Sequence, residues 1–283
     1  MRVRKVFQLV LPLCWLSVSV LWGLDSLPTT QGPLTMKLVY PANGLGSGTK
    51  QKVWVGWHIE RDHGWHTYWK HPGDVGIPPQ VKWDLPAGCE AGEIVFPPPK
   101  RVSMAGISAQ GHHGETLFLI PFYFSDIPED QHEIHLTGRF SWMACSRICM
   151  PSTTKLSLTI PVVREPLPDP YLAEKFKRFW QKQPQDLPVS WDFQAFAMGR
   201  FINLRFPRSL SKNTKRMEFF GEDRTVLSNQ TPKVRNTGDR LEWLFQQSPW
   251  KKSSPDTLAG LLAIGEGDDI AYYRLKVPVL PAQ

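Results

Sequence analysis

The sequence contains only four cysteines, and none lies beyond Cys149. The eight histidines are just as unevenly placed, since all of them fall between His58 and His135. The chain also lacks a nucleotide-binding glycine loop, a serine-hydrolase elbow and a metalloprotease helix. A catalytic role for the second half of the chain is therefore hard to argue, and we expect a structural or docking role there.

No stripe of lysine and arginine is present, although the net charge is +7. Three of the positive charges belong to Arg2, Arg4 and Lys5, at the start of the chain. This pattern excludes nucleic acid as an expected partner. The same three residues precede an almost wholly apolar run, so residues 1–24 are predicted to be a signal peptide or a membrane anchor. No other stretch is apolar enough to span a membrane.

Export would place the remaining cysteines in an oxidising compartment. Cys14 lies within the leader, and Cys89 is predicted to lie in a turn as a bystander. Cys145 and Cys149 stand between two predicted strands, Thr137–Ala144 and Lys155–Val163. A tight connection there would bring their α-carbons to about the 5.5 Å that a disulfide prefers.

A disulfide between Cys145 and Cys149 would close a short ring and constrain the unfolded chain only weakly. A redox pair therefore explains the spacing better than a staple, and Arg147 between the two cysteines is placed to favour a thiolate. A structural disulfide stays open as the alternative. A zinc half-site is disfavoured because no second cysteine pair is present.

Short alternating strands separated by Gly and Pro dominate residues 33–163, and they predict an antiparallel sandwich. Residues 164–188 read as a linker. Within it, Asp169 can cap a short amphipathic helix that begins at Pro170 and packs between the domains. Strands return over 189–281, which predicts a second, smaller sandwich. The expected fold class is all-β.

Several segments together resemble the amino-terminal periplasmic region of DsbD-type thiol:disulfide interchange proteins, with the ScsB-like branch, tied to copper tolerance, the nearest. They are the tryptophan motif Gly64-Trp-His-Thr-Tyr-Trp-Lys-His-Pro-Gly-Asp74, the pair Gly114-Glu115, and the stretch Trp142-Met-Ala-Cys-Ser-Arg-Ile-Cys-Met-Pro151. The resemblance implies immunoglobulin-like sandwiches and a redox role for the cysteine pair.

The resemblance also assigns roles to residues. It implies that Cys149 attacks or is attacked in a mixed disulfide, and that Cys145 resolves it. A shielding loop is expected at Gly106–Gly114, where His112 and His113 stand and, when protonated, would favour a thiolate nearby. The motif residues expected to matter are Trp65, His66, Trp69, Gly73 and Asp74.

The implied activity is that of an exported, periplasmic protein-disulfide reductase, which is one candidate function. Its partners would be disulfides of substrate proteins and a separate thioredoxin-like or membrane electron-transfer protein, because we expect this chain to carry neither of the family's electron-supplying domains. The alternative is a non-enzymatic copper-binding or adaptor module with a structural disulfide. Cys145, Cys149, His112 and His113 are the ligands that a soft metal would use.

Overall fold

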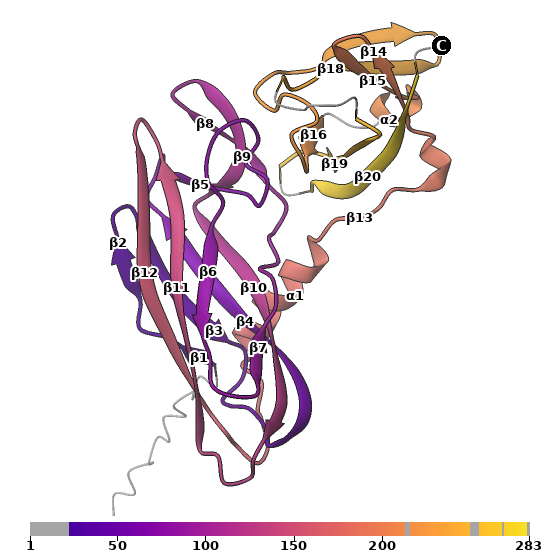
Figure 1. Ribbon diagram of the computed structural model, residues 1–283. Coiled ribbons are helices and arrows are strands. Elements are labelled where there is room, and N and C mark those ends of the chain that lie inside the picture. Colours follow the sequence, from indigo (N-terminus) through magenta and orange to yellow (C-terminus); the bar gives the residue numbers. More distant parts are fainter. Residues whose placement is uncertain (1–22, 213–215, 250–254, 268, 282–283) are drawn as a thin grey trace, which may run out of the picture.

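The chain forms two β-rich domains joined by one helix and an extended segment (Figure 1). The computed structural model describes residues 23–212, 216–249, 255–267 and 269–281. The predicted leader over 1–24 therefore lies almost wholly outside the described residues. Within the described part of the chain, no helix is long and apolar enough to cross a membrane. The all-β prediction with two sandwiches is confirmed.

Two six-stranded sheets form the first sandwich. One sheet has the order β1-β3-β4-β10-β7, with β2 added beside β3, and the other has the order β12-β11-β5-β9-β8, with β6 beside β11. The strands are β1 (Leu24–Asp25), β2 (Thr29–Gln31), β3 (Leu34–Tyr40), β4 (Gly48–Arg61), β5 (His66–Tyr68), β6 (Gln80–Asp84), β7 (Cys89–Ala91), β8 (Lys100–Met104), β9 (Ile107–His113), β10 (Glu115–Ile127), β11 (Glu133–Cys145) and β12 (Cys149–Pro161).

Alternating side chains of these strands fill the space between the two sheets. On β4, Val55, Trp57 and Ile59 face the core, where Trp57 contacts Phe118 and Phe140 with ring centroids 5.5 and 4.6 Å apart. Each fully buried side chain of this size stabilises the fold by about 1.5–3 kcal/mol. The first sandwich is therefore a stable, well-packed scaffold, and the ends of its strands extend beyond this core.

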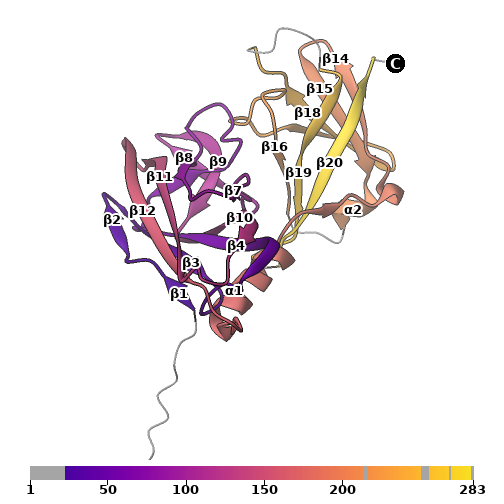
Figure 2. The same cartoon turned by 60° about the horizontal axis from the view of Figure 1, so that its bottom comes forward.

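Helix α1 (Pro170–Gln181) begins as the sequence predicts, because Asp169 accepts a hydrogen bond from the amide of Leu172 at 2.7 Å. Its position differs from the expectation. The helix does not pack between the domains but buries Leu172, Phe176 and Phe179 on the outer face of the β3-β4-β10 sheet, against Val39 and Leu119. Figure 2 shows α1 beneath this sheet. The outer face of that sheet is apolar enough to take the helix, so the junction between domains is left to other segments.

The second sandwich is built from one eight-stranded sheet that folds around its own core. Its order is β16-β19-β20-β14-β15-β18-β17, with β13 beside β20, and the pairs that β13 and β14 make with β20 are parallel. Its elements are β13 (Gln185–Asp186), the 3-10 helix η1 (Val189–Trp191), β14 (Gln194–Met198), β15 (Phe201–Pro207), α2 (Ser209–Lys212), β16 (Met217–Gly221), β17 (Lys233–Thr237), β18 (Arg240–Gln246), β19 (Thr257–Ile264) and β20 (Ala271–Leu280).

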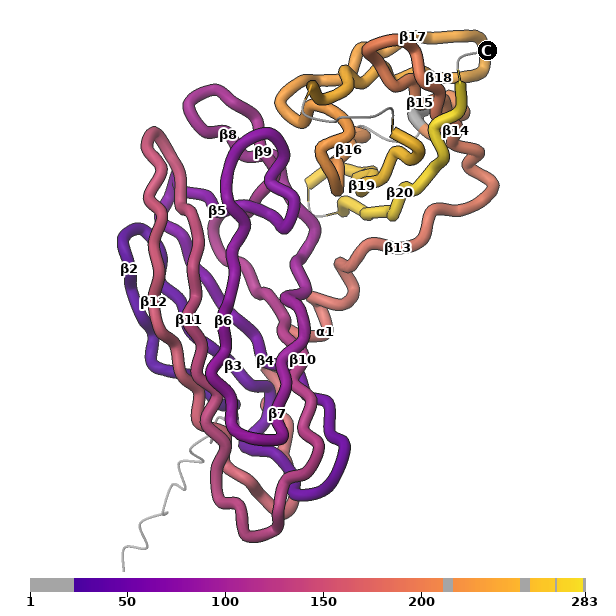
Figure 3. Tube along the Cα trace, viewed as in Figure 1, coloured from indigo at the N-terminus to yellow at the C-terminus, as the bar shows by residue number. Residues whose placement is uncertain are grey.

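The domains meet through a small apolar cluster. Trp69, next to β5, packs with Phe220 of β16 and with Leu261 and Ala263 of β19. The chain trace in Figure 3 shows that β5, β8 and β9 lie at the end of the first sandwich nearest β16. The hairpin of β11 and β12 ends at the same extremity of that domain. The cysteine pair therefore lies on the same side as the domain junction.

Candidate functional site

A disulfide joins the two residues that flank the β11–β12 turn. Cys145 ends β11 and Cys149 begins β12, and the two are directly paired in the antiparallel register with α-carbons 4.2 Å apart. In the turn between them, the amide of Ser146 donates to the carbonyl of Ile148 at 2.9 Å. The predicted hairpin position of the pair is confirmed, because the two long strands bring the thiols together at their ends.

The two sulfurs of this bond stand in different surroundings. Cys145 is fully buried, whereas Cys149 is exposed. Beside Cys149, Arg147 is exposed and Ile148 shows 62% of its surface to solvent. A protein partner can therefore approach Cys149 more easily than Cys145, and the apolar side chain of Ile148 offers it a contact surface.

Tyr68 is a site residue that the sequence reasoning missed. Its hydroxyl donates to Cys145 Sγ at 3.1 Å within a buried cluster that includes Val102, Ala109 and Met104. Burial raises the pKa of Tyr68, which keeps the hydroxyl protonated and able to donate. The available sequence clue was the alternation in the tryptophan motif, which puts His66 and Tyr68 on one face of a strand.

A row of four residues crosses the sheet at the disulfide. The register pairs Cys149 with Cys145, Cys145 with His66, and His66 with His113. Residues paired in this way share one face of a sheet. His66 is almost fully buried, and burial, followed by the charges of His113 and Arg61, lowers its pKa to about 4. The neighbour of the disulfide is thus a neutral imidazole at neutral pH.

The predicted shielding loop at Gly106–Gly114 is not a loop. Residues Ile107–His113 form β9, because they pair with β5 on one side and β8 on the other. On that strand His113 is exposed near His66, with ring centroids 5.7 Å apart. His112 lies on the opposite face, against Phe118 in the sandwich interior, so its ring does not face the disulfide.

Burial lowers the pKa of His112 to about 3, well below the 6.5 of an unfolded histidine. As pH falls below 6.5 the unfolded chain binds a proton that the folded chain refuses, so stability is lost between pH 6.5 and about 3. We expect the variant His112→Gln to reduce the slope of unfolding free energy against pH by up to about 1.4 kcal/mol per pH unit.

Urea denaturation at several pH values between 6.5 and 5 measures this slope. The matched control is His63→Gln, because His63 is exposed. An unchanged slope in His112→Gln would show that the buried imidazole does not control stability in this range.

The tryptophan motif divides between the disulfide and the domain junction. Trp65 packs, half-buried, against the core of the first sandwich. His66 is paired with Cys145 and belongs to the row at the disulfide. Trp69, Gly73 and Asp74 instead contact the second sandwich. The roles predicted for these motif residues stay predictions, and the structure adds that they fall into two groups.

Cys89 begins strand β7 and is not in a turn, since β7 pairs with β10. Its thiol is free and buried, and burial raises its pKa to about 11, which disfavours a thiolate.

Among the described residues, the side chains of His58, Glu60 and Glu115 form the one group with the spacing of metal ligands. Lys175 forms an ion pair with Glu115 at 2.8 Å, and His58 forms a hydrogen bond with Glu115 at 2.7 Å, so contacts within the protein account for His58 and Glu115 without a metal. The predicted copper ligands are not part of it, and the copper site stays a prediction.

The comparisons with known proteins agree with this geometry. Residues 39–161 match the family model described as "Thiol:disulfide interchange protein DsbD, N-terminal". No curated protein matches the chain. Among solved structures, the N-terminal periplasmic domain of ScsB from Proteus mirabilis superposes with a TM-score of 0.66 at 15% identity, covering 91% of this chain and 99% of that one.

Tandem immunoglobulin domains of titin are also matched, but weakly. The z1z2 domains, solved in complex with telethonin, give a TM-score of 0.19 at 12% identity over 90% of this chain and all of that one. A score that low carries no argument about the fold. The family match spans both sheets of the first sandwich and includes the disulfide hairpin. The family match and the fold together support a DsbD-type N-terminal domain over residues 39–161 of this chain.

Proposed function

We propose that this chain is an exported thiol:disulfide interchange protein that exchanges two electrons with partner proteins through Cys145 and Cys149. The observation that carries the proposal is the difference between the two cysteines, of which Cys149 is exposed and Cys145 is buried with its sulfur next to a hydroxyl donor. A bond whose purpose is only to close a turn needs no such difference. The periplasmic origin of the ScsB domain supports export.

The chemistry follows from which sulfur can be reached. In the reduced protein the Cys149 thiolate attacks one sulfur of a partner disulfide, forms the mixed disulfide and releases the partner's other sulfur as a thiolate. Cys145, as a thiolate, then attacks Cys149 Sγ. That step closes the intramolecular bond and releases the partner's second thiolate. Two electrons have passed to the partner, and this chain ends oxidised.

Recharging reverses these steps with a dithiol protein as the reductant. The donor thiolate attacks the exposed Cys149 Sγ, and Cys145 leaves as a thiolate. The hydroxyl of Tyr68 is positioned to stabilise that leaving sulfur, since hydrogen bonds to a charged form favour it. A second thiol of the donor then resolves the mixed disulfide. A thioredoxin-like protein has the required pair of cysteines.

The reduction potential of the pair separates exchange from a structural staple. Equilibration of the purified chain with mixtures of reduced and oxidised glutathione or dithiothreitol, followed by acid quenching and thiol alkylation, measures this potential. We expect a value above about −300 mV, the level below which structural disulfides resist reduction. A potential well below that level would contradict the proposal and favour the adaptor alternative.

A further inference from the structure

The loop of residues 70–79, which connects β5 to β6, covers the buried side of the disulfide. Val75 of this covering loop packs against the buried cluster that contains Tyr68 and Cys145. Gly76 lies flat on the Tyr68 ring at φ +104°, and a β-carbon added there would stand 2.2 Å from Tyr68 Cε1. Only glycine allows this approach. The loop therefore packs directly on the Tyr68 ring, whose hydroxyl donates a hydrogen bond to Cys145 Sγ.

The second sandwich holds the covering loop in place. The Asp74 carboxylate accepts hydrogen bonds from the Ser228 amide at 2.8 Å, the Ser228 hydroxyl at 3.0 Å and the Asn229 amide at 2.9 Å. In return, the Asp74 amide donates to Ser228 Oγ at 2.9 Å. At Gly73, a β-carbon would lie 2.0 Å from Ser228 Oγ, so the two domains touch at this point.

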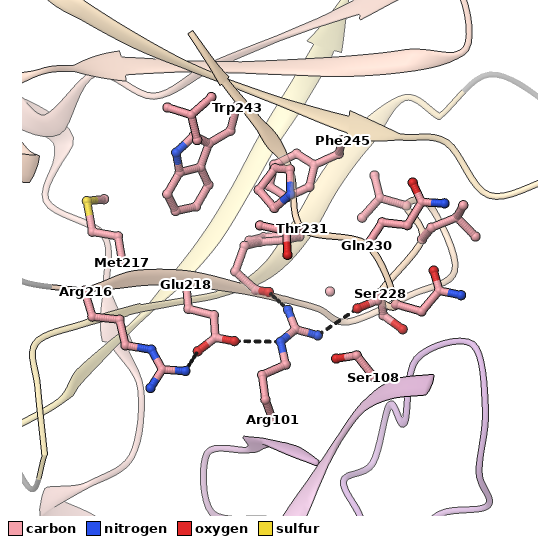
Figure 4. Close-up of a pocket in the computed structure, with 17 residues that line it drawn as sticks. Arg101, Ser108, Arg216, Met217, Glu218, Ser228, Gln230, Thr231, Trp243 and Phe245 are labelled. Carbon is pink, nitrogen blue, oxygen red and sulfur yellow. Dashed lines mark hydrogen bonds and ion pairs between the residues drawn. The ribbon is translucent and has the colours of Figure 1, made fainter. Parts of the chain in front are cut away.

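The hairpin of β8 and β9, which supplies Val102, Met104 and Ala109 to the cluster around Cys145, is held in the same way. Arg101 donates to Glu218 at 2.7 Å, to the Phe219 carbonyl at 2.5 Å and to the Ser228 carbonyl at 3.0 Å (Figure 4). Gln110, fully buried, donates to the Gly221 carbonyl at 2.9 Å.

Both Phe219 and Gly221 lie on β16, an edge strand of the second sandwich. The first domain thereby covers an edge that would otherwise leave these carbonyls unpaired. The junction is therefore a specific fit of two surfaces, and it reaches both segments that enclose Cys145.

We propose that the second sandwich acts as a clamp that keeps the Cys145 sulfur enclosed, with Asp74 and Ser228 as its positioning residues. The clamp restricts chemistry with outside molecules to Cys149 and keeps Cys145 for the resolving step. The role of the clamp in the exchange reaction rests on the proposed function. The burial of Cys145 by the clamp does not depend on that function.

The test is the rate at which each thiol of the reduced, full-length protein reacts with iodoacetamide, resolved by peptide mass spectrometry. We expect Cys145 in Asp74→Ala and in Ser228→Ala to react about tenfold faster than in the wild type, because a hydrogen-bonded contact worth about 1.4 kcal/mol is lost. The rate at Cys149 should stay unchanged in both variants.

The matched control is Lys70→Ala. Lys70 also crosses the junction, to Glu222 at 2.7 Å, but this ion pair is solvent-exposed and should contribute little. If Cys145 reacts at the wild-type rate in a folded Ser228→Ala variant, which changes a single oxygen atom, the clamp is refuted. Equal acceleration of Cys145 by Lys70→Ala would also refute it. Alkylation requires no redox partner, so this outcome is independent of whether the pair exchanges electrons with proteins.

Discussion

A Cys149→Ser variant is expected to lose all two-electron exchange while remaining folded. In the wild type, exchange is measured as transfer of reducing equivalents from a reduced thioredoxin-like protein, with thiols counted after acid quenching. The variant should show none above the uncatalysed rate, because the sulfur that partners can reach is gone. The disulfide closes a ring of only five residues, so its loss should cost about 2 kcal/mol of stability.

The control is Cys89→Ala, which removes the buried free thiol of β7 and should leave the exchange rate unchanged. The exchange rate and the free energy of unfolding are both measured for each variant, so that loss of exchange is separated from loss of stability. A Cys149→Ser variant that retained exchange would show that another thiol carries the reaction. A stability loss far above about 2 kcal/mol would favour the structural role for the bond.

The largest loss of stability among the junction residues is expected for Trp69→Ala. Trp69 has 1% of its surface exposed and packs on Phe220, Leu261 and Ala263 of the second sandwich. Removing a buried aromatic side chain of this size costs about 3–5 kcal/mol, because a cavity remains. Urea denaturation should therefore show a lower midpoint, with the two domains separating before the first one unfolds.

Trp180→Ala supplies the comparison for the same chemical change. Trp180 makes an edge-to-face contact with Trp54, with ring centroids 4.8 Å apart, yet 41% of its surface is exposed, and its loss should cost less than half as much. Equal costs for the two tryptophans would mean that Trp69 is not the anchor of the junction. The apolar cluster around Trp69 would then not contribute to holding the two domains together.

The disulfide hairpin could be predicted from the sequence because it depends on neighbours in the chain. Alternating residues predict the strands of β11 and β12, and the spacing of Cys145 and Cys149 places both at the turn. The helix could be predicted for the same reason, from Asp169 and the apolar period that follows. The surface on which the helix packs could not be predicted, because it is decided by tertiary contacts and two apolar surfaces were available.

The surroundings of Cys145 could not be predicted because they come from distant parts of the chain. Tyr68 reaches Cys145 across 77 residues, and Asp74 reaches Ser228 across 154. Residues 106–114 carry three glycines, which favour a loop locally, yet pairing with β5 and β8 makes most of them a strand. That strand then turns His112 away from the site and leaves His113 beside it.

Trapping the mixed disulfide tests the central claim most directly. The reduced Cys145→Ser variant is incubated with a thioredoxin-like protein that carries a single cysteine, activated as a mixed disulfide with thionitrobenzoate. The Cys149 thiolate attacks the protein sulfur and releases thionitrobenzoate, and neither protein then has a second sulfur that resolves the intermediate. We predict that Cys145→Ser accumulates a covalent complex through Cys149, identified by peptide mass spectrometry, and that Cys149→Ser accumulates none. A complex formed through Cys145 in Cys149→Ser, or no complex in either variant, would contradict the account.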